Sequence, residues 1–220
     1  MHEDLTILYY TADYTDSHFA DSVRMHLLET ANGIPIISVS HEPLWFGEYN
    51  ICVGRIERSA YNIYKQILLG AKEATTPYIA CCEDDCLYNE EHFKYRPPID
   101  TFAYNINRWN IDHGTYFYRQ RAGMCMNISP RQLLIDTLIE RFKKYPDPVD
   151  RINFGEPGRV ERKIGLPPKK MLTFKTGAPT LHFNHRRSCG GRRRILTTDI
   201  VSNEIKPWGE ASKLWERIHG

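Results

Sequence analysis

The chain has 220 residues, of which 41% are hydrophobic and 25% are charged, and its formal net charge is +2. These values are typical of one folded domain with a sizeable core and exclude a disordered or fibrous protein. No apolar run approaches the length that spans a bilayer, and the acidic start at Glu3 and Asp4 is unlike a signal peptide. The six cysteines form no Cys-x-x-Cys pair. We therefore expect a cytoplasmic protein with reduced thiols.

The first forty residues predict a strand, a helix and a second strand. Residues 5–10 are rich in β-forming side chains, and residues 16–31 carry apolar residues at helical spacing, with Asp16 or Ser17 as the N-cap. Asn32-Gly33 ends the helix, and residues 34–40 form the next strand. A strand–helix–strand unit of this length predicts a parallel sheet.

A second helix is expected over residues 57–74, and it leads into an apolar strand that opens at Pro77. This strand is apolar on both faces and ends abruptly in Glu83-Asp84-Asp85. Three adjacent carboxylates repel one another unless a cation lies among them, and Mg²⁺ and Mn²⁺ prefer such oxygen ligands. Ligands of open α/β sheets bind beyond the carboxyl ends of the strands, which favours a metal site over a solvated acidic turn.

The second half predicts more irregular structure. We expect a helical turn at residues 89–93, a pair of aromatic strands at 101–105 and 115–119, an apolar run at 124–128 and an amphipathic helix from Pro130 to Phe142. Five prolines between residues 146 and 168 indicate a long functional loop or lid. The last twenty-five residues predict a loop and a short helix.

Charge is divided unequally between the two halves. Residues 1–100 carry seven Lys or Arg against sixteen Asp or Glu, whereas residues 101–220 carry twenty-two against eleven. A basic second half favours an anionic partner, although a solvated basic surface gives the same count.

The acidic triplet resembles the Asp-x-Asp motif of glycosyltransferases with the GT-A fold, and the chain is most similar to family-2-type enzymes. The resemblance covers about residues 5–130, and Glu83 stands where the family has aspartate. Further motifs resemble small glycosyltransferases of phages and bacteria. These are Glu83-x-Asp85-x-Leu87-Tyr88, His92-Phe93, Pro97-Pro98, Tyr104-Asn105-x-Asn107-x-Trp109 and His185-Arg186-x-x-x-Gly190-x-Arg192.

The resemblance implies one GT-A domain over residues 1–220, with a Rossmann-like, mixed but mostly parallel sheet flanked by helices and an irregular basic C-terminal region. Residues 1–100 would bind the nucleotide sugar, residues 101–195 the acceptor, and residues 196–220 would form a tail with a helix. The implied activity is metal-dependent transfer of a sugar from a nucleotide-diphosphate sugar, with a UDP-sugar favoured and Mn²⁺ or Mg²⁺ as the cofactor.

The resemblance also implies roles for single residues. The nucleotide-sugar contacts would be Thr11, Asp13, Ser38, Ser40, Arg55, Arg58 and Asp84, and the metal ligands would be Glu83, Asp85 and His185. Arg186 is available as a further phosphate partner. Ordinary alternatives remain open, because Thr11 and Asp13 also suit a turn and Arg58 also suits a surface ion pair. His182, His185 and Cys189 could form part of a zinc site, but no fourth ligand is evident.

Inverting transfer requires a carboxylate base for the acceptor hydroxyl. The candidates are Glu156, Asp150 and Asp112, and Glu156 is preferred because its loop, residues 153–158, is punctuated by glycine and proline. The sequence leaves open whether transfer inverts or retains the anomeric configuration.

The acceptor is suggested by arginines. Five lie between residues 186 and 194, and Arg187, Arg192, Arg193 and Arg194 are the candidate DNA-binding residues. With the phage-like resemblance, this strip favours double-stranded DNA with hydroxymethylated pyrimidines, in which an enzyme reaches its target base by flipping it out of the helix. A saccharide or lipid-linked acceptor remains an alternative.

Two other classes of protein remain open. A nucleotidyltransferase also uses carboxylates and a metal on an α/β sheet, but usually carries a glycine-rich basic loop after its first strand, where this chain has the acidic residues 11–16. A non-enzymatic DNA-binding module would leave the buried strand with three terminal acids unexplained.

Overall fold

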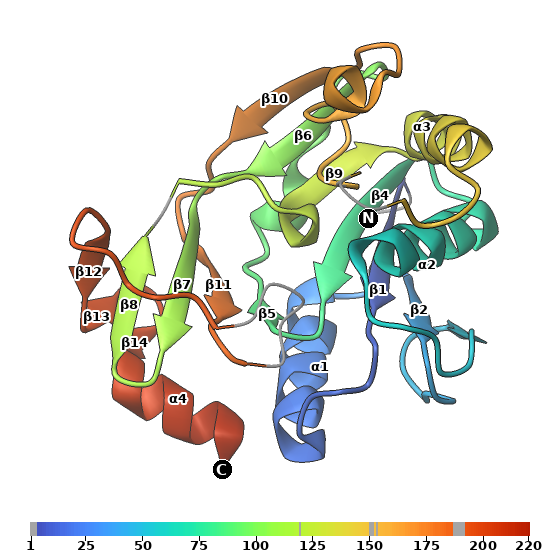
Figure 1. Ribbon diagram of the computed structural model, residues 1–220. Helices are drawn as coiled ribbons and strands as arrows, with labels where there is room; N and C mark the ends of the chain where they lie inside the picture. Colours follow the sequence, from blue (N-terminus) through green and yellow to red (C-terminus); the bar gives the residue numbers. More distant parts are fainter. Residues whose placement is uncertain (1–3, 119, 150–151, 153, 187–191) are drawn as a thin grey trace.

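The computed structural model describes residues 4–118, 120–149, 152, 154–186 and 192–220. Its main sheet has the strand order β10-β6-β9-β4-β1-β2-β3 (Figure 1). The strands are β1 (Leu5–Tyr10), β2 (Ile36–Ser40), β3 (Tyr49–Cys52), β4 (Tyr78–Glu83), β6 (Thr101–Asn105), β9 (Asn127–Pro130) and β10 (Lys170–Phe174). All neighbouring pairs are parallel except those of β9, which runs antiparallel to β4 and β6. The mixed, mostly parallel sheet confirms the predicted fold class.

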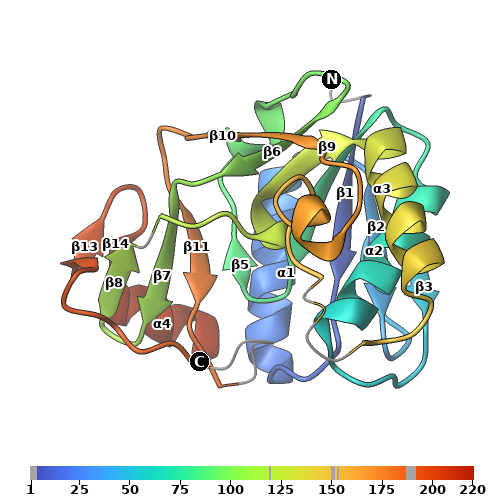
Figure 2. The same cartoon turned by 45° about the horizontal axis from the view of Figure 1, so that its top comes forward.

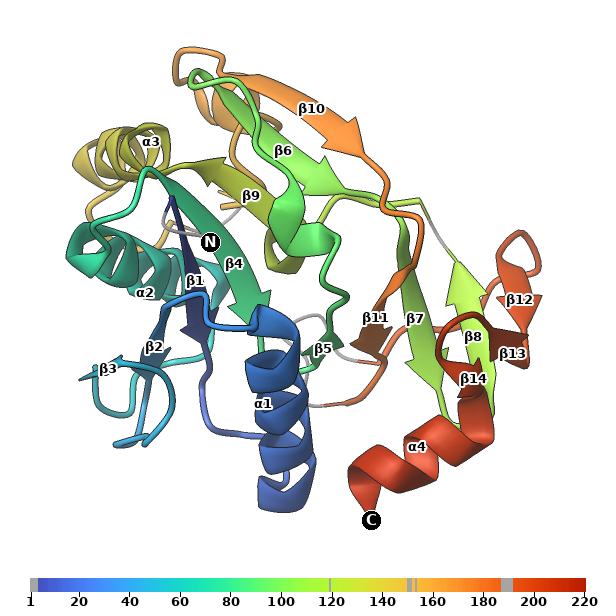
Figure 3. The same cartoon turned by 180° about the vertical axis from the view of Figure 1, so that it is seen from behind.

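Three helices cover the two faces of this sheet. Helix α1 (Ser17–Ala31) packs on the face that carries Ile7 and Tyr9, whereas α2 (Ala60–Glu73) and α3 (Arg131–Lys144) pack on the face that carries Leu8 and Tyr10. Figure 2 shows α2 and α3 side by side, and Figure 3 shows α1 on the opposite face. Alternate residues of β1 therefore enter two separate apolar cores, as expected for a strand buried on both faces.

Helix ends follow the residues that the sequence marked. The Asp16 carboxylate accepts hydrogen bonds from the N–H groups of His18 and Phe19 at 3.0 and 3.4 Å, which caps α1. Asn32 ends the same helix in the left-handed region, with φ of 46°. The expected second helix begins three residues later than predicted, because Ser59 caps it by accepting from the Asn62 N–H at 3.1 Å.

A second, smaller sheet lies beside the first, in the order β12-β8-β7-β11-β5. Its strands are β5 (Cys86–Leu87), β7 (Arg108–Asp112), β8 (Thr115–Tyr118), β11 (Thr180–Phe183) and β12 (Ile200–Ser202). The chain closes with the β13 (Glu204–Ile205) and β14 (Gly209–Glu210) ribbon and α4 (Ala211–His219). Leu214 and Ile218 of α4 pack with Phe19 and Val23 of α1 against this sheet (Figure 3).

The two aromatic runs predicted as strands are strands in the structure, but they lie in different sheets. The first run is β6 of the main sheet, whereas the second forms β8, which pairs with β7. The two belong to different sheets because β7 intervenes and turns into β8 through His113, whose φ is 53°.

Strand β3 was not expected, since it is a short, partly exposed edge strand. Single-turn 3₁₀ helices lie at η1 (His92–Lys94), η2 (Met124–Met126) and η3 (Glu161–Ile164).

The proline-rich segment after α3 is fixed to that helix by a buried ion pair. Arg141 and Glu161 are almost fully buried, and Arg141 Nε donates to Glu161 Oε1 at 2.9 Å. Arg141 Nη1 also donates to the Gly155 carbonyl at 2.9 Å, and the Gly158 N–H donates to Glu161 Oε2 at 2.6 Å. Both ends of the Glu156 turn are thereby held in place.

No helix within the described ranges is long and apolar enough to cross a membrane.

Candidate active site

Strand β4 ends at the carboxyl edge of the parallel strands (Figure 1), and the acidic residues Glu83, Asp84 and Asp85 lie at this end. Strand β1 runs beside β4, so the residues that end β1 lie next to the triplet. The Tyr10 hydroxyl donates a hydrogen bond to Glu83 Oε1 at 2.8 Å, and Thr11 Oγ1 donates to Asp84 Oδ2 at 2.5 Å. Thr11 therefore orients Asp84.

Two histidines reach the same cluster from the end of β11. The Nε2 atoms of His182 and His185 lie 3.4 and 3.3 Å from Asp85 Oδ2. The Phe183 N–H donates a 2.8 Å hydrogen bond to the Asp85 carbonyl, which fixes β11 against the triplet. The structure thus brings together residues that are about one hundred positions apart in the sequence.

Crowding changes the ionisation of these carboxyl groups. Burial and the charge of Asp85 raise the pKa of Asp84 to about 6, and burial raises the pKa of Glu83 well above its usual range. Burial also opposes ionisation of Asp85, but the two neighbouring histidines hold the pKa of that carboxyl at about 2. Asp85 therefore remains charged near neutral pH, and a bound cation would favour ionisation of the other two.

The side chains of the cluster fit a divalent cation. The ligand atoms of Glu83, Asp85, Cys86 and His182 all lie within 4.8 Å of one another. Burial lowers the pKa of His182 to about 4, so its imidazole is neutral, and its Nδ1 has no hydrogen-bond partner in the described part of the chain. Burial raises the pKa of the Cys86 thiol. The cluster thus offers carboxylate oxygens and an imidazole nitrogen, with a thiol beside them, to a divalent ion such as Mn²⁺.

Glu83 and Asp85 form a wall that two cavities share. The first cavity has a volume of about 90 Å³ and is also lined by Asp84. The second has a volume of about 410 Å³ and is also lined by His182 and Glu156. Two ligands can therefore meet at the same pair of carboxylates.

The first cavity is lined by two further predicted nucleotide-sugar contacts besides Asp84. Thr11 and Arg58 both line it, together with Tyr14 and Gln66. The Arg58 guanidinium lies 4.6 Å from the centroid of the Tyr14 ring, and Gln66 Nε2 donates to the Thr11 carbonyl at 2.9 Å. An aromatic ring, a cation and fixed polar groups thus surround this space.

Asp13 and Arg55 line a separate cavity of about 430 Å³. Asp13 Oδ2 accepts from the N–H groups of His41 and Glu42 at 2.8 and 2.9 Å, and Asp13 has a φ of 54°. Arg55 Nε pairs with Glu42 Oε1 at 2.5 Å on the surface. These predicted contacts hold the loop after β2 beside the site.

Ser38 and Ser40 are buried and line none of the three cavities. Their Oγ atoms donate to the carbonyls of Phe46 and Glu42 at 2.7 and 2.6 Å. Both hydroxyls also accept from Asn50 Nδ2 at 2.9 Å. The structure therefore gives them the role of securing the loop between β2 and β3.

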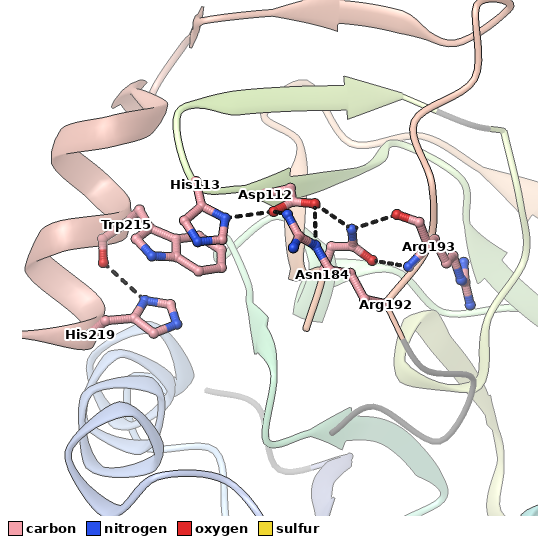
Figure 4. A network of polar contacts seen from close by, with 7 residues as sticks. All are labelled: Asp112, His113, Asn184, Arg192, Arg193, Trp215 and His219. Atoms are coloured by element: carbon pink, nitrogen blue, oxygen red, sulfur yellow. Dashed lines mark hydrogen bonds and ion pairs between the residues drawn. The ribbon is translucent and has the colours of Figure 1, made fainter. Parts of the chain in front are cut away.

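Asp112 lies in a network that occupies both of its carboxylate oxygens (Figure 4). Arg192 donates from Nε to Oδ2 at 3.0 Å and from Nη2 to Oδ1 at 2.7 Å. Asn184 Nδ2 donates to Oδ2 at 2.8 Å, and His113 Nδ1 lies 2.7 Å from Oδ1. The His113 ring stacks on Trp215 of α4, with centroids 4.4 Å apart. Asp112 and Arg192 thus anchor the segment after β11 to the second sheet.

Glu156 is the candidate base that lines the second cavity. Its Oε2 lies 3.4 Å from Arg159 Nη1, and its side chain is 16% exposed. Asp150 lies outside the described residues, as do Arg187 and Cys189. Of the remaining candidate arginines, Arg193 lines the second cavity, whereas Arg186 and Arg194 are exposed.

Three residues of the site were not assigned to it from the sequence. Arg108 and Cys86 were not singled out, and His182 was considered only for zinc. A signal for His182 was present, since it precedes His185 by three positions at the end of a β-rich run. Nothing in the sequence distinguished Arg108 from a surface arginine.

No protein-family model matches this sequence, and no curated protein matches it either. The structure is similar to a glycosyltransferase involved in the glycosylation of the major capsid of PBCV-1. The TM-score is 0.50 and the identity 10%, over 81% of this chain and 91% of that chain.

Two further structures resemble the chain more weakly. The glycosyltransferase GlyE of Streptococcus pneumoniae TIGR4 has a TM-score of 0.46 at 11% identity, over 77% of this chain and 45% of its own. HddC of Yersinia pseudotuberculosis has a TM-score of 0.44 at 12% identity, over 82% and 93%. Both scores fall below 0.5, so only the first likeness supports the fold. The chain therefore has a mixed α/β fold similar to that of a glycosyltransferase, as its sequence predicted.

Proposed function

We propose that this chain is a glycosyltransferase that takes a sugar from a nucleotide-diphosphate sugar, with a UDP-sugar favoured, and passes it to an acceptor hydroxyl. One observation carries the proposal: Glu83 and Asp85 end a buried parallel strand and face two cavities at once. A transferase needs two substrates to meet at one charged centre, and this arrangement supplies that geometry.

The first cavity is assigned to the nucleotide. Arg58 and Tyr14 supply a cation and an aromatic face, and Asp84, fixed by Thr11, supplies an acceptor for sugar or ribose hydroxyls. Glu83, Asp85 and His182, with His185 beside them, would hold Mn²⁺ or Mg²⁺. A bound cation supplies charge stabilisation for the leaving diphosphate.

The second cavity is assigned to the acceptor. Glu156 is preferred as the base, because it lines this cavity and the Arg141–Glu161 pair fixes its turn. Asp112 is less suited to the task, since both of its oxygens are engaged. Asp150 remains a further candidate.

The preferred acceptor is the hydroxymethyl group of a modified pyrimidine in phage DNA. Arg193 lines the second cavity and Arg194 is exposed, and their positive charge supports an anionic polymer as the acceptor. Arg192 is paired with Asp112. A saccharide or lipid-linked acceptor is the alternative within the same class. The different-class alternatives are a nucleotidyltransferase and a non-enzymatic DNA-binding module.

A donor screen tests the proposal. UDP, GDP, ADP and dTDP sugars are titrated into the whole chain by calorimetry, with and without Mn²⁺, and product is followed by mass spectrometry on hydroxymethylated DNA and on saccharides. We expect one nucleotide sugar to bind only with the metal. Absence of binding by every donor would refute the transferase assignment, and release of pyrophosphate from a nucleoside triphosphate would favour the nucleotidyltransferase.

A further inference from the structure

Arg108 is a buried cation with an unused hydrogen-bonding edge. Its residue is 3% exposed, and its Nε and Nη2 have no hydrogen-bond partner within the described ranges. Its Nη1 contacts only a soft acceptor, Cys125 Sγ, at 3.7 Å. Unpaired buried charges are costly, so a side chain of this kind calls for an explanation.

Two other arginines of this chain use the same two atoms, Nε and Nη2, to bind both oxygens of one carboxylate. Arg96 grips Asp4 through Nε and Nη2 at 2.8 and 2.7 Å, and Arg192 grips Asp112 in the same way at 3.0 and 2.7 Å. Arg108 forms no ion pair with any described acid. Its geometry therefore suits a two-oxygen anion that does not belong to the described chain.

The surroundings of Arg108 form a cationic wall. Arg108, Arg121 and Arg193 all line the second cavity. Glu83 and Asp85 line the same cavity and give it negative charge as well. Gly123 in the same wall leaves room for the guanidinium, because a Cβ there would lie 2.6 Å from Arg108 Nη1. The cavity thus offers carboxylates for a cation and arginines for an anion.

We propose that Arg108 binds an anionic group, a carboxylate or phosphate, carried by the acceptor that enters the second cavity. The inference rests on the proposed function, and it adds that the acceptor bears a negative charge close to its reactive hydroxyl. The donor's own diphosphate is the other source of such an anion. Its expected place is beside the metal cluster, where the first cavity meets Glu83 and Asp85.

Calorimetry with inorganic phosphate and with acetate tests this directly, on the full chain saturated with Mn²⁺ and UDP. We expect Arg108→Gln to weaken binding of at least one anion by about ten- to a hundredfold, the range for losing charge-assisted hydrogen bonds. Arg162→Gln, an exposed arginine that lines neither the first nor the second cavity, removes the same charge and should have no effect. Equal anion affinity in wild type and Arg108→Gln would overturn the proposal.

Two further variants separate binding from folding. Gly123→Ala keeps every charge but displaces the guanidinium, so anion affinity should fall by a smaller factor. Arg108→Met should unfold at the same or a higher temperature than wild type, since it removes an unpaired buried charge. A lower unfolding temperature would show that Arg108 serves the fold instead, and would count against the proposal.

The source of the anion is decided by competition. If UDP displaces phosphate from wild type, the anion site belongs to the donor and the proposal fails. If no nucleotide binds at all, the proposed function fails, but titration of phosphate into the Mn²⁺-loaded chain still decides whether Arg108 is an anion site.

Discussion

Two groups of charged side chains, one around Asp112 at the end of β7 and the other the acidic triplet at the end of β4, differ in how they are neutralised. Asp112 is surrounded by donors from Arg192, Asn184 and His113, so its charge is fully paired (Figure 4). The acidic triplet has no arginine or lysine within ion-pair distance in the part of the chain that the structure describes. The ion pair of Asp112 holds two segments of the chain together. The carboxylates of the triplet are instead available to bind a ligand, as expected for a functional site. Four experiments can break or sharpen this contrast.

The largest expected effect concerns the most deeply buried pair. Glu161→Gln leaves the Arg141 guanidinium uncompensated, and breaking a buried ion pair costs about 3–5 kcal/mol of unfolding free energy. Urea denaturation measures this loss. Glu140→Gln breaks the partly exposed pair with Lys169 and should cost less than about 1 kcal/mol. Similar losses for both variants would remove the distinction between buried and surface pairs.

Asp85→Asn should abolish metal-dependent turnover by at least about a hundredfold while leaving the unfolding temperature close to that of wild type. The Asp85 carboxylate lies beside two histidines and forms no ion pair with a described arginine or lysine. We therefore expect it to contribute to ligand binding more than to stability. Mn²⁺ affinity and product formation are measured together. The control is Asp136→Asn on the exposed side of α3. Undiminished turnover in Asp85→Asn would exclude it as a metal ligand.

Asp112→Asn should lower stability by roughly 1–3 kcal/mol at pH 7, the range for hydrogen bonds to a charged group. Burial alone would raise the pKa of Asp112, but the donors around it, led by Arg192, lower it. A lowered folded-state pKa stabilises the protein above the unfolded value near 3.9, and this stabilisation is lost as pH falls through the folded value. The difference between variant and wild type should therefore shrink below about pH 4. A constant difference would contradict the pairing.

The smallest effect is expected on the salt dependence of DNA affinity when one of the arginines at positions 192–194 is replaced. Arg194→Ala should reduce the slope of log affinity for duplex DNA against log salt by about 0.9 if it contacts one phosphate. Arg192→Ala should change the slope less, because its guanidinium already binds Asp112, but it should destabilise the fold. Filter binding over a salt series measures both. Slopes identical to wild type in Arg193→Ala and Arg194→Ala would argue against a DNA acceptor.

Local signals in the sequence predicted most of the first half of the fold, except the edge strand β3. Asp16 predicted the start of α1, whereas the start of α2 was predicted three residues too early. The apolar run before Glu83 predicted the central strand. The acidic end of that strand then located the candidate site, since strand ends in a parallel sheet meet at one edge.

Long-range pairing was the part that local signals could not supply. Strand β7 reads Arg-Trp-Asn-Ile-Asp, with a polar residue at every second position on one side, yet it is central in its sheet between β8 and β11. Arg108 at its start looks like a surface residue in the sequence, yet it is buried and its guanidinium lies beside Cys125 of η2. His182 acquires a role only because β11 pairs beside β5 at the triplet. These contacts depend on sequence separations of about seventy to one hundred residues.

The wall shared by the two cavities has a thermodynamic consequence. Any ligand in the first cavity changes the electrostatic surroundings of Glu83 and Asp85, and these same carboxylates border the second cavity. If occupation of one space alters affinity in the other by some factor, linkage requires the same factor in the opposite direction. Coupling between ligands in the two cavities would therefore act through a single pair of side chains, whichever ligand binds first.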